Sequence, residues 1–347
     1  MSQPAATQKL VNVAVVGLGF MGMTHLRAYL KNPLARVRAV CDPSRAPVNG
    51  ILPAVGGNIG APEDVRLGPD VKVFRKLEDL LADPAIHLVD ICTPTPLHPA
   101  QAIAALRAGK HVMCEKPLAR TSAEAREIQD VARSAPGVLM PAMCMRFWSG
   151  WGFLREMVRE ERFGKTLSAH FFRGSEKPAW GKSWTAQGGG DLGGALFDLH
   201  IHDTDFVYFL FGRPDAVFAT GRVTADGMVE HVVTQYQYPR GPVVSAEGSW
   251  LRAQGFNMGY QVQCERATIE FDLARGTEAL RIIEPGKPVA VVPCGAPDGY
   301  AAEIDYLLNC LVNGETTEKV TPADAVAGLE ICEAEEKSIR TQTIVPL

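Results

Sequence analysis

The feature that most constrains how this chain can fold is a glycine-rich turn between an apolar strand and a helix, near the start of the sequence. Residues 11–19 read VNVAVVGLG, a β-branched apolar run typical of a buried parallel strand, and helical periodicity follows at 21–31. Gly17, Gly19 and Gly22 complete the spacing GxGxxG. The first glycine permits a tight turn, the second lets the backbone approach a pyrophosphate, and the third lets the helix pack closely. Free N–H groups at the helix start attract the anion.

A second apolar strand, at 37–42, ends on an acidic residue, Asp42. A carboxylate at this position accepts hydrogen bonds from both ribose hydroxyls of NAD and repels the 2′-phosphate of NADP. Arg45, three residues further on, weakens this preference. We therefore expect a site for NAD, with NADP disfavoured, that includes Phe20, Met21 and Asp42.

Strands and helices alternate through the first part of the chain. After the glycine turn, the expected strands are 71–74, 88–92, 111–114 and 138–143, and the expected helices are 77–81, 97–108 and 122–134. This alternation predicts a doubly wound parallel sheet with an α/β architecture. We place this Rossmann domain at residues 10–145.

The pattern changes beyond residue 146. Helices are expected at 150–160 and 195–211, and successive strands at 216–223, 231–238, 243–250, 260–264, 267–271, 279–283 and 289–292. Strands without intervening helices predict an antiparallel sheet. Two further helices close the chain, so residues 146–347 are expected to form an α+β domain for substrate binding and oligomerisation.

Length and composition narrow the class of protein further. A chain of 347 residues is long enough for two domains with separate cores. Its formal charge of −4, without long runs of one sign, argues against a nucleic-acid partner. The eight cysteines form no CxxC pair, and no segment resembles a signal peptide or a membrane span. We expect a cytoplasmic protein with reduced thiols and no membrane partner.

Two short motifs follow predicted strands, and a longer one opens a predicted helix. Residues 92–98 read CTPTPLH, residues 114–117 read CEKP, and residues 193–205 read GGALFDLHIHDTD. With the glycine turn, they occur in the order of the Gfo/Idh/MocA (glucose-fructose oxidoreductase / inositol dehydrogenase) family, which the chain resembles over most of its length. The resemblance implies a Rossmann domain followed by a domain with a large open sheet. It also implies an NAD(P)-dependent dehydrogenase that acts on the CH–OH group of a sugar, polyol or cyclitol.

Three residues of these motifs are suited to the chemistry of alcohol oxidation. This reaction needs a base for the hydroxyl proton, and His202 is the expected base because histidine titrates near the working pH. Asp198 lies four residues earlier on the same predicted helix face and is expected to orient the imidazole. Lys116 follows a parallel strand, where its ammonium can stabilise alkoxide charge. The resemblance implies the same three catalytic residues.

Other polar residues near the motifs complete the expected cofactor site. Thr93, Pro94, Glu115 and Lys116 lie at strand ends. Glu115 is expected to help anchor the nicotinamide ribose, and Lys116 is expected to point at the nicotinamide. His98 has two open interpretations, because it either caps its helix or contacts the cofactor. Histidines and carboxylates gather at 200–205, but no Cys or His partners occur elsewhere at ligand spacing, so no metal is expected.

Tryptophan and cationic side chains occur before the predicted helix at 150–160 and again after the predicted strand at 167–173. Arg146 and Trp148 follow the last parallel strand, and Trp184 precedes a glycine-rich loop. Indole faces stack on sugar rings and cations bind hydroxyls, so these residues are candidates for binding a carbohydrate-like substrate. Ordinary aromatic packing is an equally open interpretation. His200 points away from His202 on a helix and either lines the substrate pocket or packs elsewhere.

Two other functions stay open at this point. An NAD-dependent glycosidase would use a transient redox cycle and release an aglycone without net NADH formation. A non-catalytic nucleotide-binding regulator would not need the three catalytic residues together. The sequence leaves the substrate and the physiological direction open. No later segment clearly covers the broad second sheet, so we expect a homodimer or homotetramer.

Overall fold

The computed structural model describes residues 10–57, 62–178, 193–295 and 298–347. Its contacts divide the chain into two compact units, each assembled from several stretches of sequence. The first unit comprises Met1–Glu115, Glu127–Ala142 and Tyr300–Pro322, and the second comprises Lys116–Arg126, Met143–Gly299 and Ala323–Leu347. Each unit contains residues from before and after residue 145. The division into contiguous domains at 10–145 and 146–347 therefore stays a prediction.

Six parallel strands form the sheet of the first unit, in the order β5-β2-β1-β6-β7-β8. The strands are β1 (Val11–Val16), β2 (Ala35–Cys41), β5 (Lys72–Phe74), β6 (Leu88–Ile91), β7 (His111–Glu115) and β8 (Leu139–Ala142). The central strands are apolar and buried on both faces, as a parallel sheet covered by helices requires. The strand order reverses between β1 and β6, and the edge at such a switch point is where doubly wound folds bind ligands.

Several helices and short elements alternate with these strands along the chain or follow them much later. They are α1 (Phe20–Lys31), α2 (Leu77–Leu81), α3 (His98–Arg107), α4 (Ser122–Ser134), α8 (Gly299–Asn313), the 3₁₀ helix η1 (Thr95–Leu97) and the small hairpin β3 (Ile51–Leu52) with β4 (Val65–Arg66). Helix α1 packs on β1 and β2, and α3 packs on β6 and β7. These contacts place the starts of both helices next to the carboxyl ends of the strands that precede them.

Nine strands form the mixed sheet of the second unit, in the order β16-β15-β14-β13-β9-β12-β11-β10-β17. The strands are β9 (Thr166–Glu176), β10 (Ala216–Val223), β11 (Val229–Gln237), β12 (Val243–Ser249), β13 (Leu251–Cys264), β14 (Thr268–Asp272), β15 (Leu280–Ile283), β16 (Ala290–Val292) and β17 (Val345–Pro346). The pairs are antiparallel apart from β9 with β12, which is parallel. The sheet is therefore large and mainly antiparallel.

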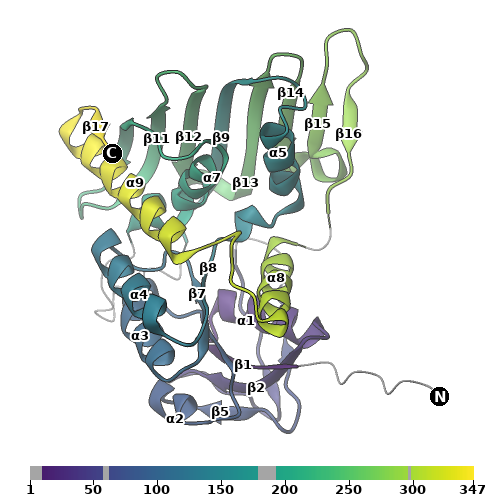
Figure 1. Ribbon diagram of the computed structural model, residues 1–347, viewed down its shortest axis with the longest axis vertical. Helices are drawn as coiled ribbons and strands as arrows, with labels where there is room; N and C mark the ends of the chain where they lie inside the picture. Colours follow the sequence, from purple (N-terminus) through teal and green to yellow (C-terminus); the bar gives the residue numbers. More distant parts are fainter. Residues whose placement is uncertain (1–9, 58–61, 179–192, 296–297) are drawn as a thin grey trace. The chain divides into compact units, whose positions relative to one another are not determined.

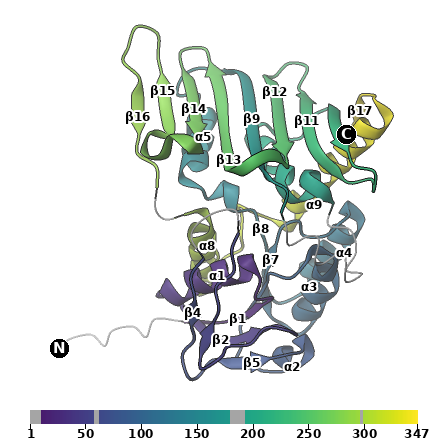
Figure 2. The same cartoon turned by 180° about the vertical axis from the view of Figure 1, so that it is seen from behind.

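Helices α5, α7 and α9 lie against one face of this sheet (Figure 1), and the view from behind shows the strands in front of them (Figure 2). The helical elements are η2 (Cys144–Arg146), α5 (Ser149–Arg159), the π-helix η3 (Leu196–His200), α7 (Ile201–Phe211), η4 (Leu273–Glu278) and α9 (Pro322–Thr341). The buried Trp151 of α5 meets the rings of Phe206, Tyr260 and Phe271, which forms an aromatic core between α5, α7 and the sheet.

The architecture confirms the predicted fold class, a doubly wound parallel sheet plus a large, mainly antiparallel one. One local prediction needs correction, because the helix expected at 195–211 is a π-helix followed by an α-helix. Among the described residues, no helix combines the length and apolarity needed to cross a bilayer.

Candidate active site

The glycine turn joins β1 to α1 in the first unit. Gly17 has a φ of 86°, and a Cβ there would lie 2.6 Å from the Cys92 carbonyl oxygen. A Cβ at Gly22 would lie 1.8 Å from the Gly17 carbonyl oxygen. At Gly19, which caps α1, no described atom lies within 4 Å of the place a Cβ would take. Two glycines are therefore required by close contacts, and the third leaves room for an anion at the helix N-terminus.

The two residues that open α1, Phe20 and Met21, are partly buried. The Phe20 ring lies against the backbone of Gly57, where a Cβ would come within 2.1 Å of the ring. Phe20 therefore closes one side of the turn, next to the loop that follows β3.

Asp42 follows β2 and binds the backbone of the glycine turn. Its Oδ2 accepts a hydrogen bond from the Leu18 N–H at 2.8 Å, and its Oδ1 accepts from the N–H groups of Ser44 and Arg45 at 2.9 and 2.8 Å. Burial raises the pKa of Asp42, but these hydrogen bonds outweigh it and lower the pKa below its ordinary value. The Arg45 guanidinium donates to the carbonyl groups of Leu18 and Pro53, beside the same carboxylate.

Apart from Lys116, which belongs to the second unit, the predicted cofactor residues at the ends of β6 and β7 lie in the same unit as the glycine turn. His98 is buried, and its Nε2 lies 2.7 Å from the carbonyl oxygen of Thr93, which precedes Pro94. This contact fixes the turn after β6, and the two interpretations of His98, a helix cap or a contact with the cofactor, stay predictions. Glu115 ends β7 and is also buried, with its Oε1 3.2 Å from Nε2 of His25.

The second unit contains all three predicted catalytic residues. Lys116 Nζ donates to Oδ1 of Asp198 at 3.0 Å and to the backbone carbonyl oxygen of Asp198 at 2.6 Å. The two side chains are 14% and 19% exposed, so this ion pair is shielded from bulk water and still accessible to a small molecule. An ammonium in this position can stabilise negative charge on a reacting oxygen.

Asp198 does not orient His202 as the sequence predicted. Asp198 lies within the π-helix, where hydrogen bonds run from residue i to i+5, so a turn holds an additional residue and the i, i+4 alignment is lost. In the described structure no hydrogen bond joins Asp198 to His202, and His202 Nδ1 is buried without a hydrogen-bond partner. The carboxylate of Asp198 binds Lys116 instead.

The electrostatic environment of His202 suits a proton acceptor. Burial, followed by the positive charges of Lys116 and Arg173, lowers the pKa of His202 well below its ordinary value of 6.5. The imidazole is therefore neutral at neutral pH, which is the state that a general base requires.

Sequence reasoning missed one residue of this environment, Arg173 of β9. Its side chain is buried, and its Nε and Nη2 donate to the Asp203 carboxylate of α7 at 2.8 and 3.1 Å. A signal was available, because Ala169, Phe171 and Arg173 share the inward-facing register of β9. An arginine at an inward position of a strand requires a buried anion.

The structure corrects the expected role of Arg146. This side chain is 1% exposed, and it binds the buried Asp205 through Nε and Nη2 at 2.9 and 2.6 Å. Its Nη1 lies 3.2 Å from Asp324 of α9, and its guanidinium stacks over the Phe209 ring. Arg146 thus joins η2, α7 and α9 inside the second unit, and we no longer expect it to contact substrate.

The other substrate candidates fall into different environments. His200 is fully buried against β11 and β12, with its Nε2 3.3 Å from the Tyr236 hydroxyl and 3.4 Å from Glu335 of α9. It therefore packs within the core, the second of the two interpretations. Trp148 is partly buried and caps α5, with its ring against the backbone of Gly299. Trp184 lies outside the described residues.

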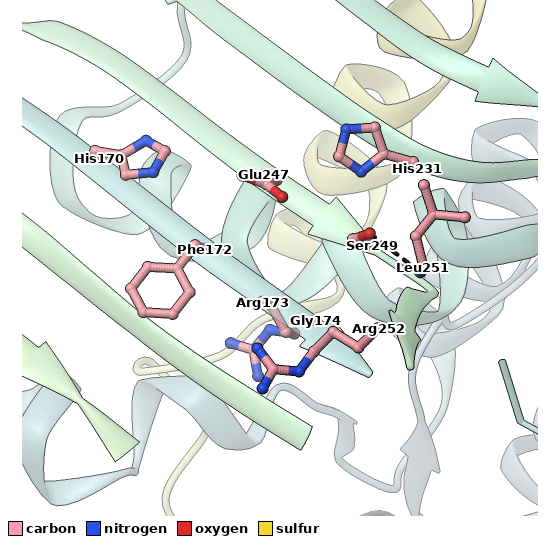
Figure 3. Close-up of a pocket in the computed structure, with 9 residues that line it drawn as sticks. All are labelled: His170, Phe172, Arg173, Gly174, His231, Glu247, Ser249, Leu251 and Arg252. Atoms are coloured by element: carbon pink, nitrogen blue, oxygen red, sulfur yellow. Dashed lines mark hydrogen bonds between the residues drawn. The ribbon is translucent and has the colours of Figure 1, made fainter. Parts of the chain in front are cut away.

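A pocket of about 510 Å³ opens on the sheet of the second unit (Figure 3). Its lining includes His170, Phe172, His231, Glu247 and Arg252. The first four alternate with buried residues of β9, β11 and β12, so they point away from the face that carries α7. None of the predicted site residues lines this pocket.

Two family models match the chain. "Oxidoreductase family, NAD-binding Rossmann fold" matches residues 11–143, and "GFO/IDH/MocA C-terminal domain" matches residues 151–270. The chain belongs to the Gfo/Idh/MocA oxidoreductase family. The resemblance predicted from the motifs is thereby confirmed, and the two models follow each other in the same order as the two predicted domains.

The chain is similar to the levoglucosan dehydrogenase of Pseudarthrobacter phenanthrenivorans, which is 34% identical over 60% of this chain and 53% of the relative. The 1,5-anhydro-D-fructose reductase of Ensifer adhaerens is 35% identical over 42% of this chain and 44% of the relative. The matches thus span about half the length of these curated relatives. A solved levoglucosan dehydrogenase in complex with NADH and levoglucosan shares the fold, with a TM-score of 0.81 at 22% identity over 97% of this chain and 99% of that chain.

Proposed function

We propose that this chain is an NAD(P)-dependent oxidoreductase that transfers a hydride between nicotinamide and a hydroxyl-bearing carbon of a sugar, polyol or cyclitol. The observation that carries this proposal is the presence of Lys116, Asp198 and a neutral His202 in one unit of a chain that also has the dinucleotide-binding turn. The names of relatives, a dehydrogenase and a reductase of sugar derivatives, support the same class of substrate.

The residues of the glycine turn fit a dinucleotide. The open space at Gly19 and the N-terminus of α1 suit a pyrophosphate, and the ionised Asp42 suits a ribose diol. NAD, when bound, supplies the hydride acceptor. Asp42 favours NAD over NADP, because a 2′-phosphate would meet a like charge and would replace the ribose hydroxyl that can donate to this carboxylate.

In the oxidation direction, His202 takes the proton of the substrate hydroxyl as the carbon loses hydride. Its lowered pKa keeps it neutral and ready to accept, while the two nearby cations, Lys116 and Arg173, make the imidazolium that forms a stronger acid. The proton therefore leaves His202 readily for water at the end of the turnover. In the reduction direction the same group delivers a proton to the alkoxide oxygen.

Lys116 stabilises the negative charge that develops on the substrate oxygen. Its hydrogen bonds to the side chain and backbone carbonyl of Asp198 fix the ammonium at the start of the second unit. Asp198 is accordingly a positioning residue for Lys116 in this proposal. An ammonium that is fixed before the reaction stabilises charge without reorganisation.

A screen of NAD reduction tests the function. The purified protein is incubated with NAD and with inositols, aldoses, anhydrosugars, sugar acids and their phosphates, and NADH formation is followed by absorbance. Net NADH formation that His202→Ala abolishes supports the proposal, and His87→Ala, at an exposed histidine just before β6, is the matched control. Release of an aglycone without net NADH would indicate the glycosidase instead.

We further propose that the sheet face that bears the pocket is buried in a homodimer or homotetramer. This face is opposite α7, and partly exposed Phe172 and exposed Val233 belong to it. A monomer by light scattering at working concentration would contradict this.

The eight cysteines are all free thiols, which supports a reducing compartment such as the cytoplasm.

A further inference from the structure

A buried histidine in the first unit is surrounded by carboxylates and has no role in the proposed chemistry so far. His25 of α1 is 0% exposed. Its Nδ1 lies 2.8 Å from Oδ2 of Asp90, and its Nε2 lies 3.2 Å from Oε1 of Glu115 and 3.8 Å from Oε1 of Glu303. Asp90 and Glu303 are also 0% exposed. The cluster therefore links α1, β6, β7 and α8 at one buried point.

The geometry determines the charge of this imidazole. A neutral imidazole has one N–H donor, and its second nitrogen is an acceptor that would repel a carboxylate oxygen. At His25, Nδ1 is hydrogen-bonded to Asp90, and Nε2, which makes no hydrogen bond within the described structure, lies 3.2 Å from a Glu115 oxygen, so a proton on each nitrogen matches both carboxylates. A buried carboxylate with no cation beside it would be costly, and the imidazolium supplies that cation.

The groups around His25 from every element reinforce this state. They are Asp90, Glu115 and Glu303, the Cys92 thiol 3.5 Å from Nδ1, the Tyr29 hydroxyl near Asp90, and the Tyr300 ring with its centroid 6.3 Å away. Burial alone lowers the pKa of His25, but the charge of Asp90 and the contacts with Cys92 raise it well above its ordinary value of 6.5.

A metal ion is the alternative occupant, because ligand atoms of His25, Asp90 and Cys92 all lie within 4.8 Å of one another. The distance of 2.8 Å between Nδ1 and Oδ2 is that of a hydrogen bond, whereas two such ligands on one tetrahedral zinc ion lie about 3.3 Å apart. Burial also raises the pKa of the Cys92 thiol, so it keeps its proton. The geometry favours a proton between His25 and Asp90.

The cluster lies at the strand ends that carry the predicted cofactor residues. Asp90 precedes Cys92, whose carbonyl oxygen meets Gly17 of the glycine turn. Glu115 ends β7 and is the residue expected to anchor the nicotinamide ribose. We propose that His25 is a positioning residue, held as an imidazolium that is hydrogen-bonded to Asp90 and ion-paired with Glu115, and that it so shapes the cofactor-binding edge of the sheet. This inference rests on the proposed binding of NAD by that edge.

The charge of His25 can be measured without any substrate. Nitrogen NMR of the histidine rings distinguishes the imidazolium from the neutral tautomers, and the His25 signal is the one lost in His25→Gln. Should that variant not fold, the signal is assigned by elimination with variants of the other histidines. We expect His25 to be an imidazolium at neutral pH, because its surroundings raise its pKa well above the ordinary value of 6.5. A neutral His25 ring at neutral pH overturns the inference. A His25 signal that shifts when zinc is added and returns to its first position with a chelator also overturns it.

The positioning role is tested by cofactor binding. His25→Gln should weaken NAD binding about tenfold or more, the scale of one lost charge-assisted hydrogen bond, with KM for NAD raised and kcat little changed. Combining it with Glu115→Gln should cost little more than either change alone, because His25 acts through Glu115. The matched control is His87→Gln, at an exposed histidine just before β6, which should leave NAD binding unchanged.

The outcomes separate this inference from the proposed function. If the wild-type protein binds no NAD, the proposed function fails, and the NMR result still decides the charge of His25. If the wild type binds NAD and His25→Gln folds and binds it equally well, the positioning role is refuted while the function stands. Equal losses in kcat and in NAD affinity would also refute it, since they would indicate a general structural defect.

Discussion

Replacing Arg146 by methionine distinguishes the role that the structure gives this residue from the role that the sequence predicted. The side chain is 1% exposed and makes two hydrogen bonds to Asp205, which is equally buried, as well as an ion pair with Asp324. Methionine retains much of the apolar volume and removes the charge. Asp205 is then left as a buried carboxylate without its main partner.

The expected loss follows from this arrangement. Removing one partner of a buried ion pair costs about 3–5 kcal/mol, because the remaining charge is uncompensated. At roughly 2–4 °C per kcal/mol for a unit of this size, Tm should fall by roughly 6–20 °C. The assays are chemical denaturation and a thermal melt followed by circular dichroism. The matched control is Arg133→Met, because Arg133 pairs with Asp130 on the surface, where both side chains are about two-thirds exposed and little change is expected.

One result would refute the structural assignment. If Arg146→Met melts like the wild type and raises KM for the substrate about tenfold or more, Arg146 contacts the substrate as the sequence analysis proposed. If instead stability falls and the kinetic constants of the remaining folded protein are close to wild type, Arg146 serves the packing of the second unit alone.

The remaining predictions concern the proposed catalytic and cofactor residues. His202→Ala and Lys116→Ala should each lower kcat by about a hundredfold or more, measured at saturating substrate, while NAD binding by fluorescence titration is retained. The pKa of His202 in the folded protein lies below the unfolded value of 6.5, so as the pH falls the unfolded chain takes up this proton before the folded chain does. His202 should therefore lower the free energy of unfolding below about pH 6.5 and have no such effect above it. Denaturation of the wild type and of His202→Asn at several pH values checks this. Lys116→Met should raise the NMR-measured pKa of His202, since it removes a nearby positive charge. Asp42→Asn should narrow the preference for NAD over NADP in paired titrations, and an unchanged ratio would show that Arg45 decides it.

The fold and the family could be predicted because they depend on local patterns. The parallel strands follow from β-branched apolar runs, and the glycine positions follow from contacts that a Cβ would violate, as at Gly17 and Gly22. These constraints act within a few residues of sequence. The partners of buried charged side chains could not be predicted in the same way, because they come from distant segments.

Arg146 and Arg173 illustrate this limit. Each arginine stands beside aromatic residues in the sequence, which is equally consistent with a sugar-binding surface and with a buried ion pair. The distinction depends on Asp205 and Asp203 of α7, which lie 59 and 30 residues further along the chain. Besides the inward register of Arg173 in β9, the sequence offers two acidic residues on a mostly apolar helix, since such positions are buried and need cationic partners.

The pairing of Asp198 was missed for a different reason, the local geometry of the helix. Its i, i+4 spacing to His202 was interpreted with the α-helical period, whereas residues 196–200 form a π-helix. The π-helix is rare in proteins as a whole, but it is often found at functional sites. The change frees Asp198 to bind Lys116 and leaves His202 under the influence of two cations. In a double-mutant cycle, Asp198→Asn should therefore be strongly non-additive with Lys116→Met, because the two side chains share a hydrogen bond, and nearly additive with His202→Asn. If the coupling instead appears between Asp198 and His202, the carboxylate acts on the imidazole during turnover, and the pairing predicted from the sequence describes the active state better than this structure does.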